Sequence, residues 1–223
     1  MLLLAFDTAT PAVTAAVLDT ETGRVLAAAD RIDARRHGEL LLPTVDEVLG
    51  EVGVTKHQLG AVVTGTGPGP YTGLRVGLAT AATLGHALGI PAYGICTLDG
   101  IAHAAHLQRV DGPFVVATDA RRKEVYWAVY DADGVRTEGP SVDRPADIAE
   151  RVAGLTAVGA GALLYPDTFP RALPEPAHQS AAALALLAAR RLAAGEELEA
   201  PLPLYLRRPD AEVPKNYKTV LPA

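Results

Sequence analysis

A loop rich in glycine and proline, followed by a long helical segment, constrains this sequence more than any other stretch. The apolar run 61–63 precedes the loop 65–70, and an alanine- and leucine-rich segment continues from Thr72 to Leu88. A β-rich run, a Gly/Pro turn and a threonine placed like an N-cap predict a strand, a tight turn and a helix. The stretch is therefore interpreted as half of an α/β crossover unit.

Small side chains recur every four residues along this predicted helix, at Gly73, Gly77, Ala81 and Gly85. Each glycine inside a helix costs about 1 kcal/mol relative to alanine, so three of them in one row need a physical reason. A row of this kind lets a second backbone approach the helix closely. We call these four residues the small-residue ridge and predict close packing along it.

The loop resembles a phosphate cradle only in its glycines. A P-loop requires Lys-Ser or Lys-Thr after its second glycine, and the dinucleotide fingerprint requires G-x-G-x-x-G, whereas Gly67-Pro68-Gly69 is followed by Pro70. The two prolines also remove backbone donors that a phosphate would use. We therefore interpret the loop as a rigid turn that orients the helix.

Composition restricts the class of protein. The 223 residues are 49% hydrophobic and 21% charged, which is enough for one sizeable core or two small ones. A formal charge of -6 argues against a chain that binds nucleic acid by itself, so any RNA contact is expected to depend on a partner. The single cysteine, Cys96, favours a reducing compartment. With no run of signal-peptide or membrane-span character, we expect a cytoplasmic protein with no membrane contact.

The segment GPGPYTGLRVG at 67–77 closely resembles the GPGSFTGLRIG signature of a bacterial family of threonylcarbamoyladenosine biosynthesis proteins, TsaB, also called YeaZ. It departs from that signature at Pro70-Tyr71, and a polar tail after Pro209 does not align. Further blocks in the same order extend the resemblance over most of the chain: Leu4–Thr10, His37–Pro43, Gly89–Pro91 with Thr97–Asp99, Asp119–Tyr126 and Pro203–Arg207.

The resemblance implies a two-lobed α/β fold of the actin-like, sugar kinase and Hsp70 type (ASKHA), each lobe a mixed sheet with helices. The second half of the sequence restarts the strand and hairpin pattern of the first, which favours the same fold. The expected domains are an N-terminal lobe, 1–108, and a smaller C-terminal lobe, 109–223, whose last segment packs back on the first. Past the first lobe we also predict a 145–153 helix and a turn at 159–161.

The same resemblance implies a required but non-catalytic scaffold subunit of the tRNA N6-threonylcarbamoyladenosine (t6A) assembly. Its expected partners are the metal-binding threonylcarbamoyl transferase paralogue TsaD and the small ATPase TsaE. A homodimer is expected when the chain is alone, and tRNA is contacted through the complex. No cofactor is expected for the chain itself, because ATP would be used by the assembly. The competing readings are a small-molecule kinase of the ASKHA type and a glycoprotease-like peptidase.

Two groups of candidate site residues follow. The partner interface is placed on the small-residue ridge and on the helix predicted from Glu39 to Val52, with the residues Gly73, Leu74, Gly77, Ala81, Gly85, Leu40, Leu41 and Val45. The alternative places the ridge inside the first lobe, against its own sheet. A weak nucleotide pocket at Asp7 and Thr8 is a second hypothesis, and the alternative is that both residues order the turn through Asx-type bonds.

No catalytic or metal-binding set can be assembled from the motifs. His37 is interpreted as a polar residue at a helix start, since H-E-x-x-H is absent. His103 and His106 stand at i, i+3 on a predicted helix, yet a third ligand is not apparent in the sequence, so we predict that they bind no functional metal. We therefore expect no catalytic residues and no metal site in this chain.

Overall fold

The first lobe is built on a five-stranded mixed sheet. The structure, a computed structural model, describes residues 1–207. The strand order is β3-β2-β1-β4-β5, and β1 pairs antiparallel with β2 and parallel with β4. The strands are β1 (Leu2–Asp7), β2 (Ala12–Asp19), β3 (Arg24–Ile32), β4 (Leu59–Gly65) and β5 (Ala92–Ile95). A short 3-10 helix, η1 (Lys56–Gln58), precedes β4.

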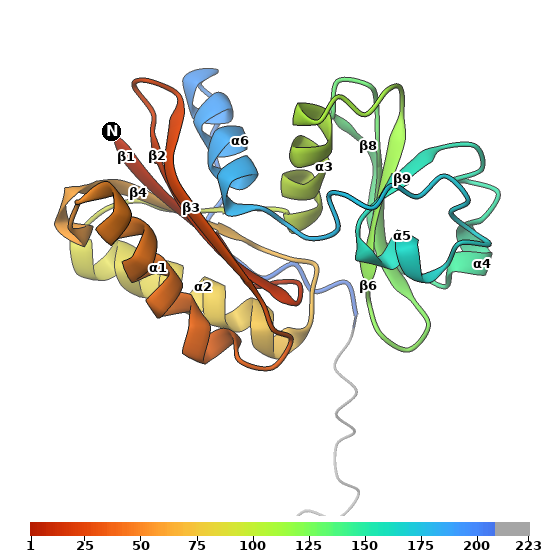
Figure 1. Cartoon of the computed structure of the whole chain (residues 1–223), viewed down its shortest axis with the longest axis horizontal. Helices are drawn as coiled ribbons and strands as arrows, with labels where there is room; N and C mark the ends of the chain where they lie inside the picture. The colour runs from red at the N-terminus through yellow and green to blue at the C-terminus, as the bar shows by residue number, and fades with distance from the viewer. Residues whose placement is uncertain (208–223) are drawn as a thin grey trace, which may run out of the picture.

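Helices cover both faces of this sheet (Figure 1). The helices α1 (His37–Val52) and α2 (Tyr71–Leu88) lie side by side on one face, and α6 (Ala181–Ala193) lies on the other. Side chains of β1 alternate between the two faces, so Leu4 and Phe6 meet α1 whereas Leu3 and Ala5 meet α6. This two-sided burial explains why β1 reads as an uninterrupted apolar run.

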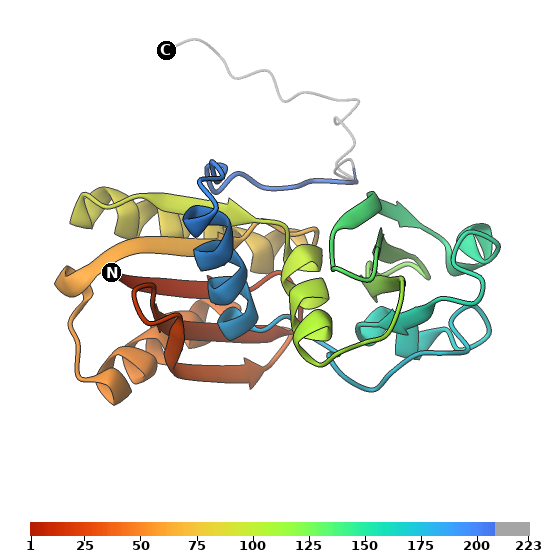
Figure 2. The same ribbon diagram turned by 90° about the horizontal axis from the view of Figure 1, so that it is seen from above.

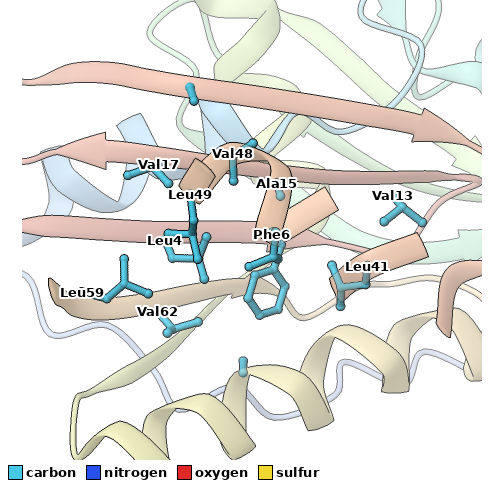
Figure 3. Packing of buried hydrophobic residues seen from close by; sticks show 13 residues of the cluster. Leu4, Phe6, Val13, Ala15, Val17, Leu41, Val48, Leu49, Leu59 and Val62 are labelled. Carbon is cyan, nitrogen blue, oxygen red and sulfur yellow. The ribbon is translucent and has the colours of Figure 1, made fainter. Parts of the chain in front are cut away.

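The core beneath α1 is densely apolar. Leu4 and Phe6 of β1 and the neighbouring residues of β2 pack with Leu41, Val48 and Leu49 of α1 (Figure 3). Burying one such side chain contributes about 1.5 to 3 kcal/mol, so this cluster anchors α1 firmly on the sheet. The helix presents its remaining face outward.

The second lobe repeats the plan on a smaller scale. Its strand order is β8-β7-β6-β9, with β6 antiparallel to β7 and parallel to β9. The elements are β6 (Phe114–Asp119), β7 (Val125–Tyr130), β8 (Arg136–Asp143), α4 (Pro145–Ile148), β9 (Thr156–Val158) and α5 (Ala160–Leu164). The first strand of each lobe thus pairs with the strand after it on one side and with a later parallel strand on the other. The predicted α/β class with a mixed sheet in each lobe is confirmed.

The helix α3 (Thr97–Leu107) joins the lobes (Figure 2). Its apolar residues, including Leu98 and Ile101, pack in the core of the second sheet with Phe114 and Tyr130. By packing, α3 belongs to the second lobe although it precedes residue 108. In the opposite direction, α6 returns from the second half of the chain to the first sheet and also contacts α3. The packed units therefore interleave along the sequence.

Several predicted element ends were wrong. The helix α2 begins at Tyr71, and its N-cap is Pro70, without a side-chain cap, rather than Thr72. Proline suits this end because the first N–H groups of a helix have no intrahelical partner. The predicted 145–153 helix ends as α4 at Ile148, and the expected turn at 159–161 opens α5. No helix in the described range 1–207 combines the length and apolarity that a bilayer crossing requires.

Candidate functional site

Asp7 is the last residue of β1, and its side chain is fully buried. Its Oδ1 accepts a hydrogen bond from the Ala9 N–H at 2.7 Å, and its Oδ2 accepts one from the Thr97 hydroxyl at 2.8 Å. Burial raises the pKa of the Asp7 carboxyl to about 6, and the hydrogen bonds from Ala9, Thr97 and Thr8 oppose that rise. Asp7 therefore fastens the end of β1 to the start of α3.

Thr8 performs a similar role toward α2. Its hydroxyl donates to the Gly73 carbonyl at 2.7 Å and accepts from the Gly77 N–H at 3.0 Å. Both Thr8 and Asp7 are turned into the first lobe, and neither lines the cleft between the lobes. This placement corrects the hypothesis of a nucleotide pocket at these two side chains. The alternative agrees with the structure, since Asp7 orders the turn by an Asx-type bond to Ala9.

The small-residue ridge faces inward, so its assignment to a partner interface was wrong. A Cβ added at Gly73 would lie 2.8 Å from the Thr8 carbonyl oxygen, and one at Gly85 would lie 2.9 Å from the Ala92 Cβ. At Gly77 the same atom would lie 2.7 Å from the Thr8 hydroxyl oxygen. The remaining ridge member, Ala81, and the adjacent Leu74 of the predicted interface are fully buried. Glycine occurs here because the chain's own turn after β1 and its own β5 approach the helix backbone.

The α1 residues of the predicted interface also face inward, so their assignment to a partner interface was wrong as well. Leu41 and Val45 are buried in the core, and Leu40 packs partly against it. The outward residue is Leu42, which is 53% exposed. Beside it, α2 turns a row of small side chains to solvent, at Ala79, Thr83 and Ala87. We call Leu42 with this row the α1–α2 face.

A cleft of about 270 Å³ separates the lobes. The turn after β1, the starts of α1 and α2, the end of β6 and the start of α5 contribute its walls, with the residues Ala9, Thr10, Pro11, Ala34, His37, Pro70, Thr118, Asp119, Arg121, Ala160, Leu164, Ala177 and His178. His37 is largely buried, and its Nε2 lies 2.8 Å from the Thr10 carbonyl oxygen. Asp119 is held by Arg121 at 3.0 Å. His37 and Asp119 are thus partnered within the chain, whereas the buried Nδ1 of His178, which also lines the cleft, has no hydrogen-bond partner among the described residues.

A buried ionic cluster around Asp99 was missed by the sequence analysis. The carboxylate of Asp99, on the first turn of α3, accepts a hydrogen bond from the Tyr130 hydroxyl at 2.9 Å. It also forms ion pairs with Arg136 of β8 at 3.2 Å and Arg191 of α6 at 3.4 Å. The cluster ties α3 to both lobes. No sequence signal links these four residues, because the fold alone brings them together.

His103 and His106 lie on α3, and neither belongs to a group of potential metal ligands among the described residues. His103 is 8% exposed, and its pKa is lowered to about 4 by burial and then by the nearby Arg190 charge. Its ring stacks with that of His106, with 6.4 Å between the centroids. Within residues 1–207 no group of three histidine, cysteine or acidic side chains could hold a metal ion. Burial also raises the pKa of the Cys96 thiol to about 12, which leaves it unreactive at neutral pH.

The last described segment, 199–207, crosses from the first lobe to the second. Gly94 donates its N–H to the Glu199 carbonyl at 2.8 Å, and Leu204 donates its N–H to the Thr66 carbonyl, also at 2.8 Å. At the far end, Arg207 donates to the Ala120 carbonyl at 3.1 Å. We call this segment the C-terminal strap. The sequence analysis expected a last segment that packs back on the first lobe but gave it no bounds, because the segment has no periodic pattern that would mark it as an element.

The comparisons with known proteins lead to proteins named for tRNA threonylcarbamoyladenosine biosynthesis and for the related threonylcarbamoyl transfer. The family model described as "TsaD: tRNA N6-adenosine threonylcarbamoyltransferase" matches residues 30–215. An uncharacterized protein of Mycobacterium tuberculosis is 47% identical over 211 residues, covering 94% of this chain and 93% of that protein. The Escherichia coli tRNA threonylcarbamoyladenosine biosynthesis protein TsaB is 33% identical over 177 residues, covering 75% of this chain and 74% of its own length.

Solved structures give the same result. The structure of YeaZ from Pseudomonas aeruginosa is 32% identical, has a TM-score of 0.77, and covers 92% of this chain and 99% of its own. A second structure, described as an uncharacterized protein with similarity to peptidase YeaZ from the same organism, has a TM-score of 0.80 at 32% identity and the same coverage. These likenesses confirm the predicted two-lobed fold of the actin-like type.

Proposed function

The chain belongs to the TsaB (YeaZ) family of tRNA threonylcarbamoyladenosine biosynthesis proteins, and on that premise we propose that it is the non-catalytic subunit of the t6A assembly. In this proposal it pairs with a TsaD-like transferase paralogue and activates it, and a TsaE-like ATPase joins the pair. ATP is used by the assembly, and the chain holds no cofactor of its own. When the paralogue is missing, the same surface pairs two copies of the chain.

The α1–α2 face carries this proposal. Leu42 is 53% exposed on an anchored helix, and leaving such a side chain in water forgoes part of the 1.5 to 3 kcal/mol, roughly, that its burial would contribute. The adjacent row Ala79, Thr83 and Ala87 repeats every four residues, so a helix of a partner can approach α2 closely there. The close helix packing that the sequence predicted for the small-residue ridge is therefore expected at this outward row instead.

The interior of the molecule supports a scaffold. Asp7, which ends the strand that begins the fold, accepts hydrogen bonds from Ala9 and Thr97. Thr8 is committed to Gly73 and Gly77. A phosphate-transferring protein of this fold class would need polar groups of this turn in its cleft. Here Asp7 and Thr8 form hydrogen bonds inside the protein instead.

A charge placed on the α1–α2 face tests the pairing. Leu42→Arg should weaken binding of the TsaD-like partner about 100-fold or more, because an arginine must then be desolvated against an apolar helix surface. The matched control is Leu107→Arg, since Leu107 lies on α3 and is 52% exposed. Binding is measured by calorimetry, and folding by the melting temperature of each isolated variant. Undiminished binding by Leu42→Arg, or equal loss in the control, would contradict the assignment.

The non-catalytic role has its own test. The purified chain with threonine, bicarbonate, ATP and tRNA should make no modified nucleoside, and the reconstituted assembly should make it. Product is measured by mass spectrometry of digested tRNA. Product from the isolated chain, with contaminating partner excluded, would refute the proposed role while leaving the pairing intact.

A further inference from the structure

The turn between β6 and β7 carries three consecutive cations in an unusual backbone conformation. Arg121, Arg122 and Lys123 have φ angles of 60°, 56° and 63°, and the only other described non-glycine residue with positive φ is Arg109. This left-handed region is unfavourable for residues with a Cβ, and runs of it are rarer still. Backbone strain of this kind concentrates at functional sites. All three side chains are exposed at the turn.

The C-terminal strap holds this turn in place. Arg207 donates to the Ala120 carbonyl at 3.1 Å and also pairs with the Glu124 carboxylate. Asp119, at the other side of the turn, pairs with Arg121 at 3.0 Å. The two carboxylates are thus matched by two arginines, and the charge of Lys123 adds to a net positive surface at this end of the molecule.

An exposed aromatic and guanidinium cluster forms where the start of α2 meets the same strap. Tyr71 of α2 stacks on Tyr205, with 5.0 Å between ring centroids. The Arg75 guanidinium lies 3.8 Å from the centroid of the Tyr71 ring and donates to the Tyr205 hydroxyl at 3.1 Å. Among the tyrosines that the structure describes, these two alone are exposed, at 46% and 42%.

The cluster and the turn form one continuous surface. Tyr205 and Arg207 are two residues apart on the strap, so their Cα atoms lie within about 7 Å of each other. Leu206 between them packs against the core of the second lobe, and Leu204 before them bonds to Thr66, which fixes the strap on both sides. We call Tyr71, Arg75, Arg121, Lys123, Tyr205 and Arg207 the basic and aromatic edge.

We propose that the basic and aromatic edge contacts a single-stranded segment of the tRNA in the assembled complex, which rests on the function proposed above. Cations attract the phosphates, and exposed tyrosine and arginine planes stack on unpaired bases, the combination that single-stranded RNA binding requires. Tyr71 is the first residue of α2, the helix that also carries the outward row of the α1–α2 face. In this proposal, RNA bound by a partner at the α1–α2 face extends onto the basic and aromatic edge.

The charge of the whole chain fits a contact that depends on the partner. A formal charge of -6 opposes RNA binding by the free protein, whereas the local excess of cations at the edge favours it once a partner supplies further affinity. Tyrosine and arginine are also common in protein hot spots, so a protein occupant of this edge is a separate outcome of the test.

Photo-crosslinking identifies the occupant directly. The photoreactive amino acid benzoylphenylalanine replaces Tyr205 in the full chain within cells, and the same replacement at Leu164, which is 57% exposed on α5, serves as control. A ribonuclease-sensitive adduct with tRNA at position 205, and none at 164, is expected. An adduct with protein only, no adduct, or equal RNA adducts at both positions would overturn the inference.

Binding of unmodified tRNA to the reconstituted complex at several salt concentrations gives the second measurement. Lys123→Glu should weaken binding about three- to ten-fold and lower the salt dependence by roughly one phosphate contact. Lys56→Glu, an equal charge change at the exposed η1, should leave binding unchanged. Tyr205→Leu should weaken binding about five-fold or more, whereas Tyr205→Phe keeps the ring and should retain most of it.

Equal effects of Lys123→Glu and Lys56→Glu, or no effect of Tyr205→Leu, would overturn the inference even if the complex forms normally. Assembly with the TsaD-like partner is measured for every variant and should be unchanged. Failure of the unaltered chain to assemble would instead contradict the proposed function, and the crosslink at position 205 would still decide the inference.

Discussion

The inward placement of α2 predicts that adding a single methyl group at Gly77 destabilises the protein. A Cβ at this position would lie 2.7 Å from the Thr8 hydroxyl oxygen and 3.1 Å from the Thr64 hydroxyl oxygen. The Thr8 hydroxyl cannot move freely, because it donates to the Gly73 carbonyl and accepts from the Gly77 N–H. Gly77→Ala must therefore disturb this pair of buried hydrogen bonds or push α2 away from the sheet.

Three effects set the magnitude. Overpacking costs about 1 to 3 kcal/mol. Disturbing a buried hydrogen bond costs a further 1 to 3 kcal/mol, roughly. The better helix propensity of alanine returns about 1 kcal/mol. We expect Gly77→Ala to lower the free energy of unfolding by about 3 kcal/mol, which corresponds to a fall of roughly 6 to 12 °C in melting temperature for a domain of this size.

Urea titration and thermal melting of the purified chain measure this loss. The matched control is Gly50→Ala in α1, where an added Cβ would meet nothing within 4 Å. The control should gain about 0.5 to 1 kcal/mol from helix propensity alone. If Gly77→Ala stabilised the chain as Gly50→Ala does, the packing of the small-residue ridge against the first lobe would be refuted.

Three further outcomes are expected. Because the folded-state pKa of His103 is about 4, below its ordinary 6.5, its stabilising contribution is present above about pH 6.5 and is lost as the pH falls toward 4. That loss is about 1 to 2 kcal/mol after allowance for solvent screening, and His103→Gln should flatten this part of the measured stability profile; an unchanged profile would contradict the assignment. Asp99→Asn should cost about 2 to 3 kcal/mol in urea unfolding, because Arg136 and Arg191 lose their shared carboxylate while remaining partly solvated; a neutral result would argue against the cluster. Lys123→Gly should raise the free energy of unfolding by about 0.5 to 1 kcal/mol by relieving its left-handed backbone, and destabilisation would contradict that strain.

The sequence by itself determined most of the secondary structure and the family. The apolar run 2–6, the hairpin turn at 19–23 and the periodic segment ending at Val52 carry local signals, namely alternation, turn residues and helical spacing, that do not depend on distant residues. His103 and His106 were predicted to share a helix, and both lie on α3, Thr97–Leu107. The signature at 67–77 identified the family because its glycines and prolines are tied to one loop geometry.

Tertiary structure alone decided which way each surface faces. The spacing of the small-residue ridge showed that something packs closely on α2, but period four fixes only a row on the helix and not what lies against it. The occupant proved to be the chain's own turn at Thr8 and its own β5. A neighbouring row on the same helix, Ala79, Thr83 and Ala87, lies outward, and its four-residue period alone does not distinguish it from the inward row.

The remaining features depend on residues that are far apart in the chain. Asp99 meets Arg191, and Tyr71 meets Tyr205, only after both lobes have folded and the C-terminal strap has crossed between them. Local patterning carries no information about such pairs, because each side chain alone is compatible with a solvated surface. The sequence thus determined the elements and the family, whereas the long-range packing of the lobes decided the site, since contact between distant segments is a property of the folded chain.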